Sequence, residues 1–199
     1  MKCVVFDVGN VLVRWDPFNL YRQMGYSEGE MQAIMADIGL PELNHRKLDA
    51  GAEFGPVIAQ LASSFPEHKD FILAFHERWS DMLGGAIEAN VAVLRDLKAK
   101  GVPVYGLSNF NREKFDIARA KFSFLDEFDG LVVSGDIGLV KPDREIYDYL
   151  IDKCGLDATQ SLFIDDSAAN IEAAKVLGFK TVWYREGEVD LAAEIVDRR

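Results

Sequence analysis

Five short stretches of the chain are almost continuously apolar and predict β-strands. Strands that are covered on both faces of a parallel sheet lack the alternating polar positions of half-exposed strands. The five stretches are Cys3–Phe6, Val102–Leu107, Leu131–Val133, Leu162–Ile164 and Thr181–Tyr184.

Apolar residues recur at helical spacing before the second, fourth and fifth of these stretches. The three sets are Ile87, Val91, Leu94 and Leu97, then Ile146, Leu150 and Cys154, then Ile171, Ala174 and Leu177. Strands that alternate with helices are typical of a parallel sheet with right-handed crossovers. The pattern therefore predicts an α/β fold.

The segment between the first two stretches, from about Trp15 to about Gly85, is too long for a single crossover. It holds several helix signals and no convincing strand. Ser27 and Glu30 have the spacing of a capping box. We therefore expect a helical insertion, with Gly84 and Gly85 as the hinge by which the chain returns to the core.

Two further patterns support helices in this insertion. Asp16 followed by Pro17 is typical of a helix N-cap with proline at the first helical position. An apolar stripe at helical spacing follows, for which packing within the insertion is the expected role. The stripe consists of Phe71, Phe75, Trp79 and Met82.

The predicted fold is a Rossmann-like three-layer core with a five-stranded parallel sheet and an inserted α-helical cap. Residues 1–14 and 86–199 form the expected core, and residues 15–85 form the expected cap. A chain of 199 residues has the length for this arrangement. Its composition, 49% hydrophobic and 28% charged, is ordinary for a globular protein.

A formal net charge of −11 disfavours nucleic acid or an anionic membrane as a partner. An anionic substrate would need a local positive charge from a lysine or a metal ion. Cys3 and Cys154 are expected to be buried thiols in a reducing compartment. No apolar run approaches the ~18 residues of a membrane span, and no signal peptide is apparent. We expect a cytoplasmic protein, either a monomer or a homodimer.

Polar residues follow the first two predicted strands. Asp7 comes directly after the first, which places its carboxylate at the edge of the sheet where α/β proteins bind ligands. A turn aspartate is an equal alternative on this evidence alone. Ser108 and Asn109 end the second strand and could hold a phosphate oxygen, although a helix cap or turn is the more common role.

Lys141 and a pair of acids lie further along the chain. Lys141 precedes a proline, which holds it extended at the expected start of a helix, although most lysines lie at the surface. Asp165 and Asp166 follow the fourth strand and would repel each other unless a hard cation such as Mg²⁺ lay between them. Asn170 would share a helical face with Asp166. A helix N-cap is the alternative, but it accounts for only one of the two acids.

In this order, the four motifs resemble those of the haloacid dehalogenase-like (HAD) superfamily, subfamily IA, which has a helical C1 cap. The resemblance covers the whole chain. It implies that Asp7 is the nucleophile and that Ser108 is the phosphate-binding hydroxyl residue. It also implies that Lys141 steadies the nucleophile and the phosphate. It further implies that Mg²⁺ binds to the Asp7 carboxylate, the Gly9 carbonyl and Asp166.

The remaining site residues follow from the same resemblance. Asp165 and Asn170 are expected to support the metal site. The expected substrate-binding residues are Ser108, Asn109, Lys141, Gly9 and Asn10.

Gly9 departs from the pattern of most phosphatases in the superfamily, which have a second aspartate there as general acid and base. The run Asp-x-Gly-Asn-Val, followed by Trp15, resembles a subgroup that includes bacterial glucose-1-phosphate phosphatases, which also have glycine at this place. One explanation for Gly9 is a positive φ angle. Asp16 could replace the missing acid, although helix capping is its favoured role.

Some polar residues of the cap have no assigned chemistry. His45, His68 and His76 lack metal-ligand spacing and are expected to be surface or packing residues. The other three could face the substrate, although a solvated loop is the expected setting. They are Asn44, Arg46 and Asp49.

The sequence thus predicts a Mg²⁺-dependent phosphatase that hydrolyses a small phosphorylated metabolite, such as a sugar phosphate, through an aspartyl-phosphate. A metal-independent 2-haloacid dehalogenase is one alternative, but the resemblance leads us to expect serine and asparagine there in place of Asp165 and Asp166. A catalytically impaired binding protein is the other, and only Gly9 favours it.

Overall fold

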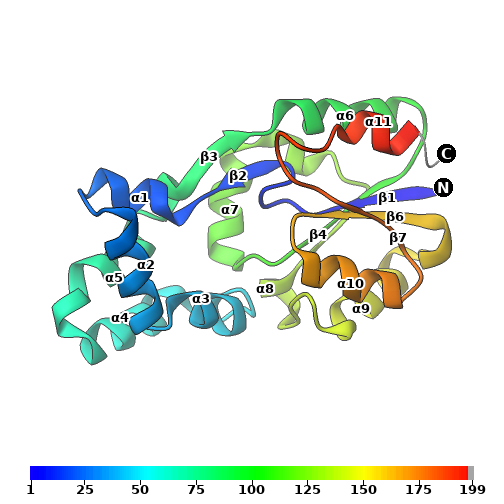
Figure 1. Cartoon of the computed structure of the whole chain (residues 1–199). Helices are drawn as coiled ribbons and strands as arrows, with labels where there is room; N and C mark the ends of the chain where they lie inside the picture. Colours follow the sequence, from blue (N-terminus) through cyan, green and yellow to red (C-terminus); the bar gives the residue numbers. More distant parts are fainter. Residues whose placement is uncertain (197–199) are drawn as a thin grey trace.

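The computed structural model describes residues 1–196 and contains the predicted parallel sheet. Its five strands lie in the order β5-β4-β1-β6-β7, and every neighbouring pair is parallel (Figure 1). The strands are β1 (Cys3–Phe6), β4 (Val104–Ser108), β5 (Gly130–Val133), β6 (Ser161–Asp165) and β7 (Lys180–Trp183). All five predicted stretches are confirmed, with small shifts at their ends.

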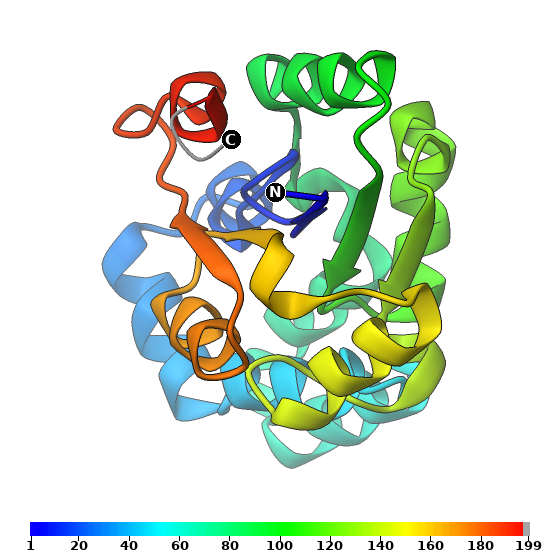
Figure 2. The same cartoon turned by 90° about the vertical axis from the view of Figure 1, so that its right-hand side faces the viewer.

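Helices cover both faces of this sheet, which confirms the three-layer core (Figures 1 and 2). Successive side chains of a strand point to opposite faces. Accordingly, Val4 and Phe6 belong to one buried cluster and Val5 to another. The first cluster includes residues of α6 (Glu88–Ala99), α7 (Arg112–Lys121) and α11 (Leu191–Val196); the second includes residues of α9 (Arg144–Cys154) and α10 (Ala168–Val176).

The insertion after β1 is mainly helical, as predicted. It contains α1 (Pro17–Gln23), α2 (Glu28–Asp37), α3 (Leu40–Leu43), a π-helical turn (Asn44–Leu48), α4 (Phe54–Ser64) and α5 (Lys69–Glu77). Asp16 caps α1 by accepting a hydrogen bond from the Phe18 amide at 2.9 Å. Ser27 and Glu30 form the expected capping box at the start of α2. The boundaries proposed for core and cap remain a prediction.

Two short strands that we did not expect join the insertion to the core. β2 (Val13–Trp15) pairs antiparallel with β3 (Leu83–Ala86). The expectation of no strand between about Trp15 and Gly85 is therefore wrong at both ends of the segment. Gly84 and Gly85 lie within β3 rather than in a separate hinge. Both strands lack the continuous apolar run that marked the core strands, since β2 contains Arg14 and β3 contains Gly84 and Gly85.

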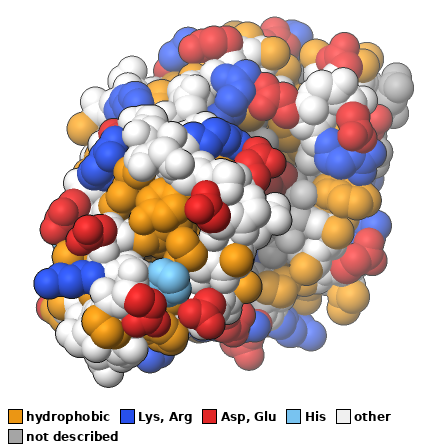
Figure 3. Space-filling model, turned by 60° about the vertical axis from the view of Figure 1, so that its left-hand side comes forward, with side chains coloured by type: hydrophobic (Ala, Val, Ile, Leu, Met, Phe, Trp, Pro, Cys, Tyr) orange, Lys and Arg blue, Asp and Glu red, His pale blue; other side chains and the backbone are white. Residues whose placement is uncertain are grey.

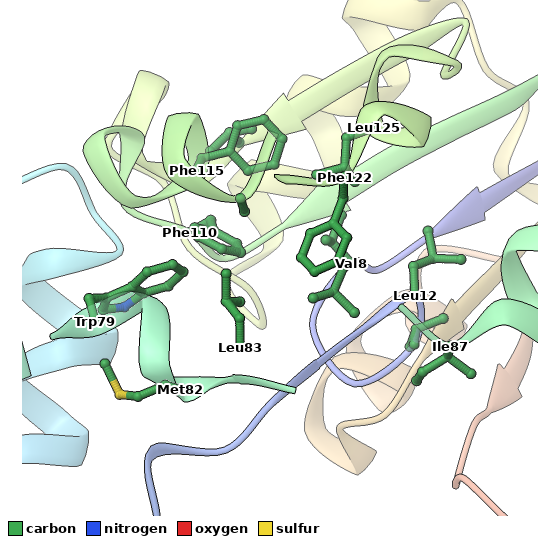
Figure 4. Close-up of a cluster of buried hydrophobic side chains, with 14 of the residues drawn as sticks. Val8, Leu12, Trp79, Met82, Leu83, Ile87, Phe110, Phe115, Phe122 and Leu125 are labelled. Carbon is green, nitrogen blue, oxygen red and sulfur yellow. The ribbon is translucent and has the colours of Figure 1, made fainter. Parts of the chain in front are cut away.

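The apolar stripe of the insertion is buried, but it also contacts the core. Phe71 stacks on Tyr21 inside the insertion, with ring centroids 3.6 Å apart. Trp79, by contrast, packs edge-on against Phe110, which follows β4, at 5.5 Å (Figure 4). The stripe therefore packs partly within the insertion, as expected, and partly against the core.

The face of the molecule shown in Figure 3 mixes charged side chains of both signs with exposed apolar ones. Cys3 is buried and Cys154 is half-buried, and both are free thiols. Across residues 1–196, every helix is too short or too polar to cross a membrane.

A tight turn of the insertion, residues 48–52, is fastened to the core by side-chain hydrogen bonds. Asn111 donates to the carbonyls of Leu48 and Ala52 at 2.7 and 3.0 Å. The Ser134 hydroxyl donates to the carbonyl of Asp49 at 2.5 Å. The position of this turn is therefore set by the core.

We predict that Gly51→Ala destabilises the protein by at least about 1–3 kcal/mol. Gly51 has a φ of +94°, and a Cβ there would lie 2.6 Å from the carbonyl oxygen of Gly135. Urea denaturation would measure the change in the free energy of unfolding. Gly29→Ala in α2 is the control, because a Cβ there meets nothing within 4 Å. Equal stability of the two variants would contradict the close approach.

Candidate active site

Asp7 lies where β1 ends, at the carboxyl edge of the sheet. Its backbone amide donates to the carbonyl of Ile164 at 2.8 Å, which extends the pairing of β1 with β6. Its Oδ1 accepts hydrogen bonds from the Val8 amide at 2.7 Å and pairs with the Lys141 ammonium at 2.9 Å. The carboxylate is thereby fixed in one orientation at the expected place.

Lys141 is 1% exposed, which excludes the surface role that is usual for lysine. Its Nζ lies 2.9 Å from Asp7, 2.7 Å from Asp165 and 2.9 Å from the carbonyl oxygen of Leu107. Burial disfavours the ammonium, but the two carboxylates outweigh burial and raise the pKa of Lys141. The residue precedes α9 in a loop and not in the helix itself, because α9 begins only at Arg144.

Asp165 and Asp166 have different surroundings although they are adjacent. Asp165 is fully buried, and its Oδ1 accepts from the Ser167 amide at 2.8 Å and from Asn170 at 2.9 Å. Asp166 is partly exposed and accepts a hydrogen bond from Asn10. Asn170 therefore supports Asp165 directly, whereas we expected it beside Asp166.

Three carboxylates, those of Asp7, Asp165 and Asp166, meet at this edge of the sheet. Each offers an oxygen within 4.8 Å of the others. Burial raises the pKa of Asp7 to about 7, against the lowering effect of Lys141, and burial also raises the pKa of Asp166. One ammonium does not neutralise three acids. The chemistry of this donor set fits a hard divalent cation.

Ser108 and Asn109 lie beside Lys141 at the end of β4. The Ser108 side chain is buried at the end of this strand. Asn109 brackets the backbone of Lys141: its Nδ2 donates to the Lys141 carbonyl at 2.9 Å, and its Oδ1 accepts from the Lys141 amide at 2.8 Å. The amide of Asn109 thus positions Lys141, a contact that the sequence alone did not predict.

A cavity of about 90 Å³ lies between the insertion and the core, and Gly9, two residues after Asp7, is part of its wall. Gly9, Asn109 and Asn111 line it from the core, and Asn44 and Asp49 line it from the insertion. Aromatic rings and one lysine complete the wall. They are Trp15, Phe54, Trp79, Phe110 and Lys114.

Asn44 and Asp49 face this cavity, so the expected solvated loop is wrong for both. Asn44 donates to Oδ2 of Asp49 at 3.1 Å. Burial raises the pKa of Asp49 to about 7, although Lys141 and a hydrogen bond from the Asn111 backbone both lower it. Arg46 instead forms an ion pair with Asp143 at 2.9 Å and lies at the surface.

Lys114 is a buried lysine in the cavity wall that no sequence pattern predicted. Its Nζ lies 2.9 Å from Nδ1 of His76, 2.9 Å from Glu113 and 4.4 Å from the centre of the Phe54 ring. A lysine in an amphipathic helix usually lies at the surface. Only the packing of the insertion against α7 buries this one.

The three histidines fit the expected packing and surface roles. His76 contacts Lys114, His45 lies 3.5 Å from Asn109, and His68 lies 3.6 Å from Asp37.

Comparison with known proteins shows the family to which this chain belongs. A family model of haloacid dehalogenase-like hydrolases matches residues 1–178. The chain belongs to this family. It is therefore a hydrolase, and the fold and the order of its strand-end motifs agree with that membership.

Two relatives and one solved structure illustrate the likeness. D-ribitol-5-phosphate phosphatase of Bacteroides thetaiotaomicron is 39% identical over 194 residues, covering 91% of this chain and 90% of that protein. Sesquiterpene phosphatase astK of Aspergillus oryzae is 27% identical over 180 residues, covering 89% and 86%. A HAD family enzyme of B. thetaiotaomicron, in complex with magnesium and inorganic phosphate, superposes with a TM-score of 0.70 at 22% identity, covering 95% and 96%. The glucose-1-phosphate phosphatase-like subgroup stays a prediction.

Gly9 of this HAD-like hydrolase does not need to be glycine for its backbone conformation. The positive φ angle in the loop belongs to Asn10, at +53°, and not to Gly9. A Cβ at Gly9 would meet nothing within 4 Å. The suggested positive φ at Gly9 is therefore wrong, and the backbone there can accept a residue with a Cβ.

Lys141→Met is expected to destabilise the hydrolase by about 3–5 kcal/mol, because it leaves buried carboxylates without their cation. Urea denaturation without added metal would measure this loss. Lys100→Met is the matched control, since Lys100 pairs with Asp96 at the surface and exposed pairs contribute about 0–1 kcal/mol. Similar losses in both variants would show that Lys141 does not neutralise the site.

Asp49→Asn should stabilise the protein more at pH 8 than at pH 5. The pKa of Asp49 is raised on folding, so the stability that its protonated form contributes is complete below pH 4 and is lost as the pH rises through about 7. Asparagine does not ionise and avoids this loss. Thermal unfolding of wild type and Asp49→Asn at pH 5 and pH 8 would test this prediction. The same difference in stability between the two proteins at both pH values would contradict it.

Proposed function

We propose that this protein is a Mg²⁺-dependent phosphatase in which Asp7 attacks the phosphorus of a small phosphate ester. The observation that carries the proposal is the Lys141 ammonium, 2.9 Å from Asp7, beside two further carboxylates. A carboxylate attacks an anionic phosphate only where positive charge offsets the repulsion between them. The phosphatase activities named for the two relatives agree with this function.

Mg²⁺ would be held by the Asp7 carboxylate, the Gly9 carbonyl and Asp166, with Asp165 and Asn170 supporting the site. Bound there, it supplies positive charge that offsets the anionic substrate. Asp165 is already engaged by Lys141, Ser167 and Asn170. Asp166, which is more exposed, is therefore the better placed of the two acids to bind the ion.

The other groups of the site would act on the phosphate directly. Lys141 steadies the Asp7 carboxylate and faces the incoming phosphate, and the Ser108 hydroxyl can donate to a phosphate oxygen. Asn10 is held by hydrogen bonds to the Trp15 amide and to Asp166, so it shapes the loop. Asp7 takes the phosphoryl group to form an aspartyl-phosphate, which water then hydrolyses.

The paired acids favour this function over a 2-haloacid dehalogenase. Dehalogenation by the same aspartate needs no metal, and Asp165 and Asp166 would add unfavourable charge without one. The ordered contacts of Asp7 and Lys141 likewise argue against a catalytically impaired binding protein.

The cavity suggests a small substrate whose alcohol portion is partly apolar. A volume of about 90 Å³ is well below that of a typical ligand pocket, ≈300–1,000 Å³. Asn44 and Lys114 offer polar contacts between aromatic rings. A sugar phosphate remains the substrate class that we propose, in keeping with the activity named for the ribitol-phosphate relative.

Asp7→Asn is expected to abolish Mg²⁺-dependent hydrolysis of p-nitrophenyl phosphate while the melting temperature stays close to that of wild type or rises. Asparagine keeps the shape of the side chain but cannot form the acyl-phosphate. Asp152→Asn, an exposed acid of α9, is the control and should retain full activity. Wild-type turnover by Asp7→Asn would refute the function.

EDTA treatment provides a second arm of this experiment. Excess EDTA should remove the activity, and added Mg²⁺ should restore it. Full activity in EDTA would instead favour the dehalogenase, which 2-chloropropionate would then reveal.

A further inference from the structure

The proposed reaction needs a group that can give and take a proton, and Gly9 cannot supply one. The leaving alkoxide must gain a proton, and the attacking water must lose one. Asp16 is the nearest carboxylate in the sequence, but its Oδ1 caps α1 and its Oδ2 lies 3.2 Å from Arg22. Asp16 is therefore engaged elsewhere.

Asp49 is the carboxylate that the insertion places in the active-site cavity. It lines the same cavity as Gly9 and Asn109. Asn44 donates to its Oδ2 at 3.1 Å, and the Asn111 backbone also donates to the carboxylate. Two donors from different parts of the chain thus hold the carboxylate in the wall of the cavity that Gly9 also lines.

The core holds this carboxylate in position through the turn of residues 48–52. Asn111 and Ser134 bind three carbonyls of the turn, and Gly51 allows its backbone to lie against Gly135. Such fastening is not expected of a solvated loop. Fixed placement is what proton transfer requires, because the donor must lie within hydrogen-bond reach of the reacting oxygen.

We propose that Asp49 is the general acid and base of this hydrolase and replaces the aspartate that is absent at Gly9. The inference rests on the proposed phosphatase function and adds a catalytic residue contributed by the insertion.

The charges around Asp49 are compatible with both of its protonation states. Lys141 acts on it from the core, Lys114 lies in the wall of the same cavity, and His45 follows Asn44 in the turn before it. Burial outweighs the effect of Lys141 and raises the pKa of Asp49 to about 7. A pKa near neutral pH is the value at which one group can act as acid and then as base.

Asp49 loses a proton in the first step of the reaction and regains one in the second. Protonated Asp49 gives its proton to the ester oxygen as the bond from phosphorus to that oxygen breaks and Asp7 becomes phosphorylated. The ionised Asp49 then takes a proton from water as the water oxygen bonds to phosphorus and the Asp7 carboxylate leaves. Alcohol and inorganic phosphate are the products, and Asp49 is again protonated.

The test measures leaving-group dependence with Mg²⁺ present, on a series of aryl phosphates and one alkyl phosphate. Asp49→Asn should lose about 10²–10⁴-fold in kcat/KM on the alkyl phosphate. It should lose far less on 2,4-dinitrophenyl phosphate, whose leaving group needs no proton. Asp16→Asn and Glu42→Gln, which change carboxylates nearby in the sequence, should keep the wild-type dependence. If Asp49 had only a structural role, Asp49→Asn would lower kcat/KM equally for all substrates. That result overturns the proposal.

Gly9→Asp supplies a second test that does not depend on the folding of Asp49→Asn. Because Asp49 already provides the proton, Gly9→Asp alone should not raise kcat/KM on the alkyl phosphate by orders of magnitude. Added to Asp49→Asn, it should restore part of the lost rate, since a Cβ at Gly9 would meet nothing within 4 Å. A gain of orders of magnitude from Gly9→Asp alone would show that wild type lacks an acid and would overturn the role of Asp49.

Failure of the underlying function gives a different result. If wild type and Asp7→Asn hydrolyse 2,4-dinitrophenyl phosphate equally, the phosphatase function fails and this inference fails with it. If Asp7→Asn is inactive but Asp49→Asn matches wild type on every ester, only the role of Asp49 is wrong.

Discussion

The ion pairs of Lys141 with Asp7 and Asp165 are the interaction on which the arrangement of the site depends. Carboxylates that end neighbouring parallel strands necessarily lie close together, and burial alone would drive them to bind protons. The buried ammonium, 2.9 and 2.7 Å from the two acids, offsets part of this charge. Asn109 holds the backbone of Lys141 through two hydrogen bonds, so the ammonium has one position rather than many.

The negative charge of the three acids that Lys141 does not neutralise affects both the stability of the fold and the proposed reaction. Three acids and one lysine leave a net negative charge, which suits the divalent cation that we propose for this site. In the proposed function, that cation and Lys141 would allow the Asp7 carboxylate to approach a phosphate ester. The charge that makes the cluster costly to bury would then be the charge that binds the cation, in a protein with a net charge of −11.

The insertion completes the site from the other side. Its turn of residues 48–52 is fixed by Asn111 and Ser134 of the core, and Trp79 packs on Phe110. These contacts place Asn44 and Asp49 in one cavity with Gly9. The insertion therefore forms part of the cavity wall, and the role that we propose for Asp49 would make it part of the chemistry as well.

The sequence by itself determined the sheet, its flanking helices and the strand-end residues Asp7, Ser108 and Asp165. Buried parallel strands must be apolar, and the residues that end them must meet at one edge, so local pattern fixes both. The β2–β3 pair, the burial of Lys114 and the placement of Asp49 were decided only by the tertiary structure. Each depends on contacts between segments far apart in the chain, such as Ser134 with Asp49, 85 residues away. Neither periodicity nor residue type predicts such contacts. A lysine or aspartate is the same letter in the sequence whether packing buries its side chain or leaves it in water.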